Sequence, residues 1–231
     1  MPGIFGTAYV VLQGIAGTLV VTFTCFTTAI ITGLVVAVLR RLHIPVLGGV
    51  LNGLVYLFRS IPVLIAVFLV YFGLPSFGIT VPPLPAMNIS IGLISGSYLA
   101  EVFRGALELV DRSEREAAET AGFSRLQIIT NLELPQMFRF SVPGVLNEFS
   151  SILKASPFAY TIGISEMTRQ AMTLTAVTMN GLAVYSVAGL FYFTIYRISV
   201  SVARAIESRL HISAKEIEEL RMKEYGIDKP D

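Results

Sequence analysis

The sequence predicts an all-α integral membrane protein with five transmembrane helices. Of its 231 residues, 54% are hydrophobic and only 14% are charged, and the mean hydropathy is +0.70. No charged residue precedes Arg40. A helix that crosses a bilayer needs roughly 20 predominantly apolar residues. The stretches that meet this requirement are 18–39, 54–73, 89–109, 139–163 and 181–203.

Basic residues are divided unequally between the segments that connect these stretches. The segments on one side of the membrane hold nearly all of them, and the other side holds Arg169 alone. Because segments rich in Lys and Arg stay in the cytoplasm, the asymmetry predicts an N-out, C-in arrangement, which five spans also require. The basic residues on the inner side are Arg40, Arg41, Arg112, Arg115, Arg125, Arg209, Lys215, Arg221, Lys223 and Lys229.

The length and composition predict a single membrane domain, residues 1–231, with a short cytoplasmic tail at 206–231. Residues 3–16 are apolar and uncharged, which suggests an interfacial helix before the first span. Irregular backbone is not tolerated against lipid, so the proline-rich segment 74–88 is predicted to be an extracytoplasmic loop. Its prolines are Pro75, Pro82, Pro83 and Pro85.

A polar insert at 113–135 interrupts the apolar chain and carries two helix-start signals. In a capping box, a Ser side chain accepts the backbone N–H three residues on, and the Glu or Gln there bonds back to the Ser N–H. The pairs that fit this pattern are Ser113 with Glu116, and Ser124 with Gln127.

Gly122 lies between the two capping signals. Glycine is the residue that most readily adopts the left-handed conformation that closes a helix. The pattern therefore predicts a helix over 114–121, a sharp bend, and a second helix over 125–132 that Pro135 stops. Such a helix–turn–helix would lie on the membrane surface.

The insert resembles the EAA loop of ATP-binding cassette importer permeases. In that family the loop is the cytoplasmic coupling element, which docks into a groove on the ATPase subunit. The resemblance therefore implies an ATPase-coupling role for this loop. The matching residues are Glu116, Ala117, Ala118, Gly122, Leu134 and Pro135.

Three further segments are similar to one branch of that family, the polar amino acid permeases, and together the resemblance covers roughly residues 15 to 205 in the right order. They are Leu57 to Pro62, Tyr98 to Gly105, and the run from Pro143 through Asn147-Glu148-Phe149 to Lys154.

Two segments depart from the family pattern. Ser113-Glu114 stands where the family has Gly-Gln, and this change keeps a helix start. Residues 154–158 read Lys-Ala-Ser-Pro-Phe, whereas the family reads Lys-Asp-Thr-Ser-Leu. The second change removes an acid and two small polar groups from a buried segment and adds Pro157, so it bears on the substrate class.

The resemblance implies the permease subunit of an importer in the cytoplasmic (inner) membrane, which moves a polar amino acid or related small solute inward by alternating access. The implied partners are two copies of a cytoplasmic ATPase subunit, a second permease subunit, identical or homologous, an extracytoplasmic solute-binding protein and membrane lipid. No nucleic acid is expected. The chain is not expected to be an enzyme, because it has no Gly-x-x-x-x-Gly-Lys-Ser/Thr run to cradle ATP phosphates. One cysteine and two histidines predict no metal site, and no cofactor is expected.

Ionisable residues inside the predicted spans are further candidates for a functional role. An acid or base at a helix centre costs roughly 2.5–3.5 kcal/mol, so it should face a cavity, a partner or a neighbouring helix. Glu101, Glu148 and Lys154 lie near the middle of their spans, where a role in the translocation pathway and a role in packing are both open. Arg59 and Arg104 lie near the cytoplasmic ends and are predicted to form structural ion pairs.

Pro157 is predicted to break the fourth span beside Lys154, because proline cannot bond the carbonyl of Leu153. Opened backbone near mid-membrane needs protein or water to satisfy it, which indicates a cavity there. A self-sufficient secondary transporter or channel is an alternative that also uses buried charges. It would not require a protruding, capped helix pair.

Overall fold

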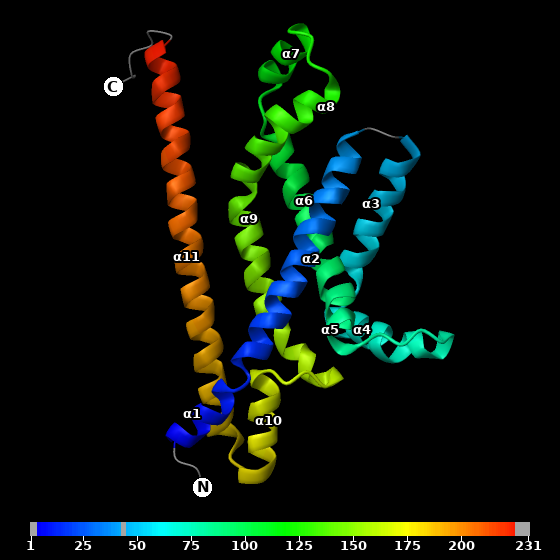
Figure 1. The fold of residues 1–231 in the computed structure, drawn as a ribbon, viewed down its shortest axis with the longest axis vertical. Coiled ribbons are helices and arrows are strands. Elements are labelled where there is room, and N and C mark those ends of the chain that lie inside the picture. The colour runs from blue at the N-terminus through cyan, green and yellow to red at the C-terminus, as the bar shows by residue number, and fades with distance from the viewer. Residues whose placement is uncertain (1–3, 43–44, 225–231) are drawn as a thin grey trace.

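The computed structural model describes residues 4–42 and 45–224, and within these ranges every regular element is helical. The end of the predicted tail, including Lys229, lies outside the described residues. Long helices carry the chain back and forth between the two ends of the molecule (Figure 1). They are α2 (Ile15–Arg41), α3 (Pro45–Ser60), α6 (Leu93–Glu108), α9 (Leu134–Ala155) and α11 (Gly181–Glu224).

The short elements divide between the two ends. Helices α7 (Arg112–Thr120) and α8 (Arg125–Ile128) lie at the same end as the last turns of α11 (Figure 1). Helices α1 (Ile4–Leu12) and α10 (Met167–Thr178) lie at the opposite end. The first and last helices thus begin and end on opposite sides of the bundle.

The core is built on the crossing of α2 and α6, which small residues allow to approach closely. A Cβ added to Gly33 on α2 would lie 2.7 Å from the Leu99 Cβ, and one added to Gly96 on α6 would lie 2.7 Å from the Thr32 Cβ. Such contacts are shorter than side chains tolerate. Close backbone approach at small residues is the usual way in which helices associate inside a membrane.

Within the described residues, three helices are long and apolar enough to cross a membrane: Ile4–Arg41, Pro83–Glu108 and Gly181–Val202. A fourth is added if Val46–Ser60 and Val63–Phe77, which are bent by 103° at their junction, form one broken span. The predicted span 54–73 therefore does not form one continuous helix. Pro62 has no N–H to donate and restricts the residue before it, so the helix breaks there.

The fourth predicted span, 139–163, ends as a helix earlier than expected. Helix α9 stops at Ala155, and a 3₁₀ turn, η5 (Ser156–Ile162), follows with Pro157 in its first turn. The break predicted at Pro157 is confirmed. The Leu153 carbonyl accepts the Ser156 hydroxyl at 2.9 Å, so a local side chain satisfies the carbonyl that the proline leaves open.

The connection 74–88 is more regular than predicted. It contains the 3₁₀ helix η2 (Leu74–Phe77) and the α-helix α5 (Pro83–Met87), and only residues 78–82 between them are irregular. Prolines near the start of η2 and of α5 do not disrupt these helices. The N–H groups of a helix's first turn have no partner within the helix, so a proline there removes no hydrogen bond. The last predicted span and the tail are also continuous, since α11 runs to Glu224.

Candidate functional site

The surface helix pair forms where the sequence predicts it, with different boundaries. Asp111, not Ser113, caps α7, and its Oδ1 accepts the Ser113 N–H at 2.8 Å. The capping box of Ser124 and Gln127 is present at the start of α8. Pro135 does not stop a helix: it lies in the first turn of α9, where a missing N–H costs nothing. The π-helical turn η4 (Ile129–Glu133) joins α8 to α9.

Gly122 makes the bend between α7 and α8. Its φ is +83°, in the left-handed region, and its N–H donates to the Glu119 carbonyl at 3.0 Å. The Phe123 N–H donates to the Ala118 carbonyl at 3.1 Å, and this pair of bonds closes the helix. We refer to α7, α8 and η4 together as the surface loop.

The residues of the EAA pattern are mostly exposed. Glu116 and Ala117 face outward on α7, and Glu116 pairs with Arg112 on the same exposed face at 2.6 Å. Beside the bend, the apolar side chains of Phe123 and Leu126 are 48% and 63% exposed. Gly122 and Pro135 are exposed, whereas Ala118 and Leu134 are half-buried. A protruding surface that mixes charge with uncovered apolar side chains is suited to a protein partner.

Glu133, at the end of the surface loop, is a buried acid that the sequence did not single out. Its side chain is 2% exposed, and both carboxylate oxygens accept hydrogen bonds from Arg41 at the end of α2. Arg115 of α7 lies 3.6 Å from the same carboxylate. Burial alone would raise the pKa of Glu133, but these arginines outweigh it and hold the pKa below its usual value.

Glu101 also pairs with the end of α2. Arg40 donates to its Oε1 at 2.6 Å, and Arg104, one turn along α6, donates to its Oε2 at 2.9 Å. Because Arg40 is the penultimate residue of α2, this contact places Glu101 of α6 beside the end of α2. Arg104 additionally bonds Glu108 at 2.7 Å.

Arg59 does not form the predicted ion pair with any described residue. Its guanidinium lies over the ring of Tyr98 on α6, with Cζ 4.8 Å from the ring centroid. The Tyr98 hydroxyl in turn donates to the Arg59 carbonyl at 3.4 Å. A cation over an aromatic face holds α3 against α6 in place of a salt bridge.

Glu148 and Lys154 contact different helices and lie apart from Glu101. The half-buried Glu148 carboxyl meets the hydroxyl of Ser95 on α6. The exposed Lys154 ammonium lies 5.8 Å from the ring centroid of Tyr196 on α11. The three residues predicted as candidates for a pathway therefore form no single cluster.

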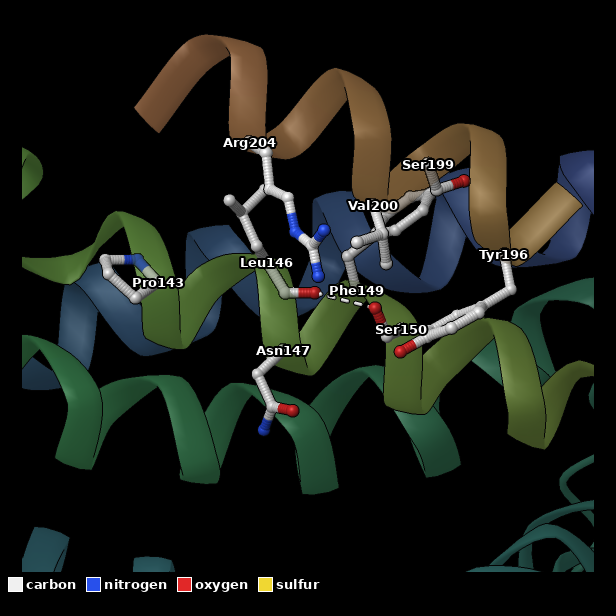
Figure 2. A pocket seen from close by; sticks show the side chains of 9 residues that line it. All are labelled: Pro143, Leu146, Asn147, Phe149, Ser150, Tyr196, Ser199, Val200 and Arg204. Carbon is white, nitrogen blue, oxygen red and sulfur yellow. Dashed lines mark hydrogen bonds between the residues drawn. The ribbon is translucent and has the colours of Figure 1, made fainter. Parts of the chain in front are cut away.

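A cleft of 210 Å³ separates α9 from α11 close to Lys154 (Figure 2). The Tyr196 side chain, which Lys154 approaches, also forms part of its wall. Polar groups from both helices line it, and the Ser150 hydroxyl donates to the Leu146 carbonyl at 3.0 Å. Its lining residues are Pro143, Leu146, Asn147, Phe149, Ser150, Tyr196, Ser199, Val200 and Arg204.

Glu166 is a second buried acid, at the opposite end of the molecule from Glu133. It is 0% exposed and caps α10, where it accepts the backbone N–H groups of Thr168 at 2.8 Å and Arg169 at 2.7 Å. The Tyr192 hydroxyl on α11 donates to it at 2.6 Å. Burial raises the pKa of Glu166, although these hydrogen bonds oppose the rise. Glutamate is an uncommon cap, so the residues around Glu166 carry no recognisable capping signal.

Known proteins resemble this chain over most of its length. A family model described as the binding-protein-dependent transport system inner membrane component matches residues 29–212. The chain belongs to this family. Its members are inner-membrane permeases and are not themselves catalytic, so the chain is a multi-pass subunit of the cytoplasmic membrane that works with a separate ATPase and a binding protein.

Individual relatives cover nearly the whole chain. The L-cystine transport system permease protein TcyB of Bacillus subtilis is 30% identical over 198 residues, 85% of each chain. The histidine/lysine/arginine/ornithine transport system permease protein HisQ of Salmonella typhimurium is 29% identical over 223 residues, which is 92% of this chain and 98% of HisQ.

Solved structures agree on the fold. The crystal structure of an amino acid ABC transporter with histidines matches with a TM-score of 0.80 at 28% identity, covering 87% of this chain and 94% of that one. An inward-facing structure of the MetNI methionine ABC transporter matches with a TM-score of 0.74, covering 87% of this chain and 96% of that one. At 18% identity, the second match shows the fold alone.

Proposed function

We propose that this permease subunit moves a polar amino acid into the cell, and that the surface loop is the element through which its ATPase partner drives transport. The observation that carries the coupling role is the exposed, doubly capped α7–α8 pair with the left-handed bend at Gly122. The substrate class is supported by relatives named for cystine and for histidine, lysine, arginine and ornithine.

The proposed assembly has two permease subunits, identical or homologous, above two ATPase subunits. Each permease is one membrane domain of five spans, N-out and C-in. Support comes from the ten-to-one distribution of basic residues and from the positions of α1 and the end of α11 at opposite ends of the bundle (Figure 1). In this arrangement the surface loop faces the cytoplasm, where the ATPase lies.

The proposed path runs along α9, and Glu148 and Lys154 are its candidate polar groups. Two observations favour α9: the helix is broken at Ala155, and a polar cleft opens between it and α11. Ligand sites commonly form where a concave surface gathers a few polar groups. Glu101 is a weaker candidate, because Arg40 and Arg104 already occupy its carboxylate.

Transport itself is tested in proteoliposomes that contain the permease, its ATPase and its solute-binding protein. Radiolabelled polar amino acids should accumulate inside only when ATP is supplied on the cytoplasmic face. Accumulation that needs an ion gradient but no ATP would overturn the proposal in favour of a secondary transporter.

The coupling role is tested by Gly122→Val. A β-branched residue with φ near +83° is strained by about 1–3 kcal/mol, although nothing lies within 4 Å of the added Cβ. The loop should tilt, while the permease stays inserted and binds the ATPase more weakly. The control is Gly105→Val, where an added Cβ is equally unobstructed and φ is not left-handed. Co-purification and ATP hydrolysis unchanged from wild type in Gly122→Val would contradict the coupling role.

A further inference from the structure

The last two residues of α2 bind two different parts of the molecule. Arg40 donates to Glu101 on α6, and Arg41 donates through two nitrogens to Glu133 of the surface loop. Successive residues of an α-helix point about 100° apart, so two adjacent arginines can contact two separate elements. The end of α2 is thereby tied both to the bundle and to the loop.

The contact between Arg41 and Glu133 is more buried than the ion pair between Arg112 and Glu116 on α7. Glu133 is 2% exposed and Arg41 is 23% exposed, whereas the side chains of Arg112 and Glu116 are 85% and 60% exposed. Exposed pairs hold their partners together weakly because water competes for both charges. A buried carboxylate that loses its cation is left uncompensated, so this pair resists separation.

Further hydrogen bonds join the remaining parts of the loop to the same point. Arg125 of α8 donates to the main-chain carbonyl of Arg41 at 3.0 Å, and Arg115 of α7 lies 3.6 Å from Glu133. Gln136 at the start of α9 donates to Glu114 of α7 at 2.6 Å. The surface loop and the end of α2 are therefore linked as one body, although 92 residues separate Arg41 from Glu133 in the chain.

We propose that the Arg41–Glu133 pair transmits the movement of the surface loop to α2. The chain itself connects the loop only to α6 and α9, so without this pair α2 would follow the loop indirectly, through packing. With this pair, α2 moves directly with the loop, as α6 and α9 do. The contact between Arg40 and Glu101 makes α2 and α6 move together. Arg41 and Glu133 are positioning residues, and the inference rests on the proposed function, because it requires an ATPase that drives the loop.

The test compares Arg41→Gln, Glu133→Gln and the double variant Arg41→Gln/Glu133→Gln in the complete importer. The readouts are ATPase binding, basal ATP hydrolysis, and the amount of amino acid taken up per ATP hydrolysed. The double variant is decisive, because neither Arg41 nor Glu133 keeps its charge without the other. Arg115 loses the Glu133 carboxylate in Glu133→Gln and in the double variant alike, so that loss is common to both. The control is Arg197→Gln, which removes an exposed arginine of α11, a helix outside the proposed link.

The expected result is normal ATPase binding and basal hydrolysis with uptake per ATP lowered about three- to thirtyfold, the range that single links in a coupling path produce. The double variant should lose no more than either single variant, because both remove the same link. Arg197→Gln should match the wild type.

Three outcomes would overturn the proposal. Wild-type uptake per ATP in the double variant would show that the pair transmits nothing. Losses that multiply in the double variant would show that the two residues act independently. A double variant that fails to insert or to bind the ATPase would make the pair a requirement for folding. Failure of the wild-type complex itself to couple uptake to ATP would instead refute the proposed function, so the two failures are distinguishable.

Discussion

The two ends of the molecule each bury one glutamate, and they stabilise it in opposite ways. At the loop end, Glu133 is held by the guanidinium groups of Arg41 and Arg115. At the other end, Glu166 is held by two backbone N–H groups and the Tyr192 hydroxyl, with no cation within ion-pair distance in the described residues. The pKa of Glu133 is lowered and that of Glu166 is raised.

The difference shows that burial does not by itself decide the charge of an acid. Desolvation raises both pKa values, and only the arginines at the loop end reverse the effect. A charged link is directional and strong, which suits an element that has to transmit force. A cap made from neutral donors orders a helix start without requiring a counter-charge, which suits a junction between α2, α10 and α11.

The largest expected effect is at the loop end. Glu133→Ala leaves Arg41 and Arg115 without their shared carboxylate, which costs about 3–5 kcal/mol for a buried pair broken on one side. Amide hydrogen exchange over 125–136 should accelerate a hundredfold or more, because each 1.4 kcal/mol corresponds to about tenfold. The exposed neighbour substitution Glu119→Ala is the control. Unchanged amide protection over 125–136 would show that Glu133 does not hold this segment in place.

A smaller effect is expected at the other end. Glu166→Ala removes the cap of α10 but leaves no charge unpaired, so the helix start should lose about 0.5–2 kcal/mol. The Tyr192 hydroxyl keeps a partner, since it lies 3.2 Å from the Thr168 hydroxyl. Hydrogen exchange over 166–178 measures the loss, with Ser165→Ala as the control. A loss of amide protection as large as that in Glu133→Ala would show that the cap at Glu166 contributes as much stability as the ion pair at Glu133.

The smallest expected effect is the response to pH, and it should have opposite signs at the two ends. The lowered pKa of Glu133 means that its contribution is present above the ordinary value of 4.5 and is lost as the pH falls through the folded-state pKa. The raised pKa of Glu166 means that its contribution is present below 4.5 and is lost as the pH rises through the folded-state pKa.

Hydrogen exchange over the two segments, corrected for intrinsic rates, measures this response between about pH 3 and 7. Acidification should loosen 125–136 and tighten 166–178. Movement of both segments in the same direction would contradict the opposite pKa shifts of the two acids.

Local features of the surface loop could be predicted from the sequence. The bend at Gly122 and the capping box at Ser124 depend on residues three or four positions apart, and both are present. The start of α7 was misjudged because Asp111 and Ser113 are both good caps, and the sequence alone does not choose between them. The break at Pro157 could be predicted for the same reason, because a proline disrupts the helix through residues close to it in the chain.

Contacts between distant segments could not be predicted. Nothing near Glu133 in the chain indicates that Arg41 binds it, and nothing near Glu101 indicates its partner Arg40, which lies 61 residues away. The break at Pro62 was overlooked since hydropathy alone continues smoothly from α3 into α4 (Val63–Phe68). Periodicity reports which residues are apolar, whereas the register between helices is decided by packing.

The length of helix α11 limits how a partner can reach the surface loop. Its 44 residues make a rod about 66 Å long, roughly twice the thickness of the hydrocarbon layer. The surplus emerges at the end where α7 and α8 lie (Figure 1). Any partner seated on the surface loop must therefore fit alongside this rod, which closes one direction of approach and leaves the opposite flank open for docking.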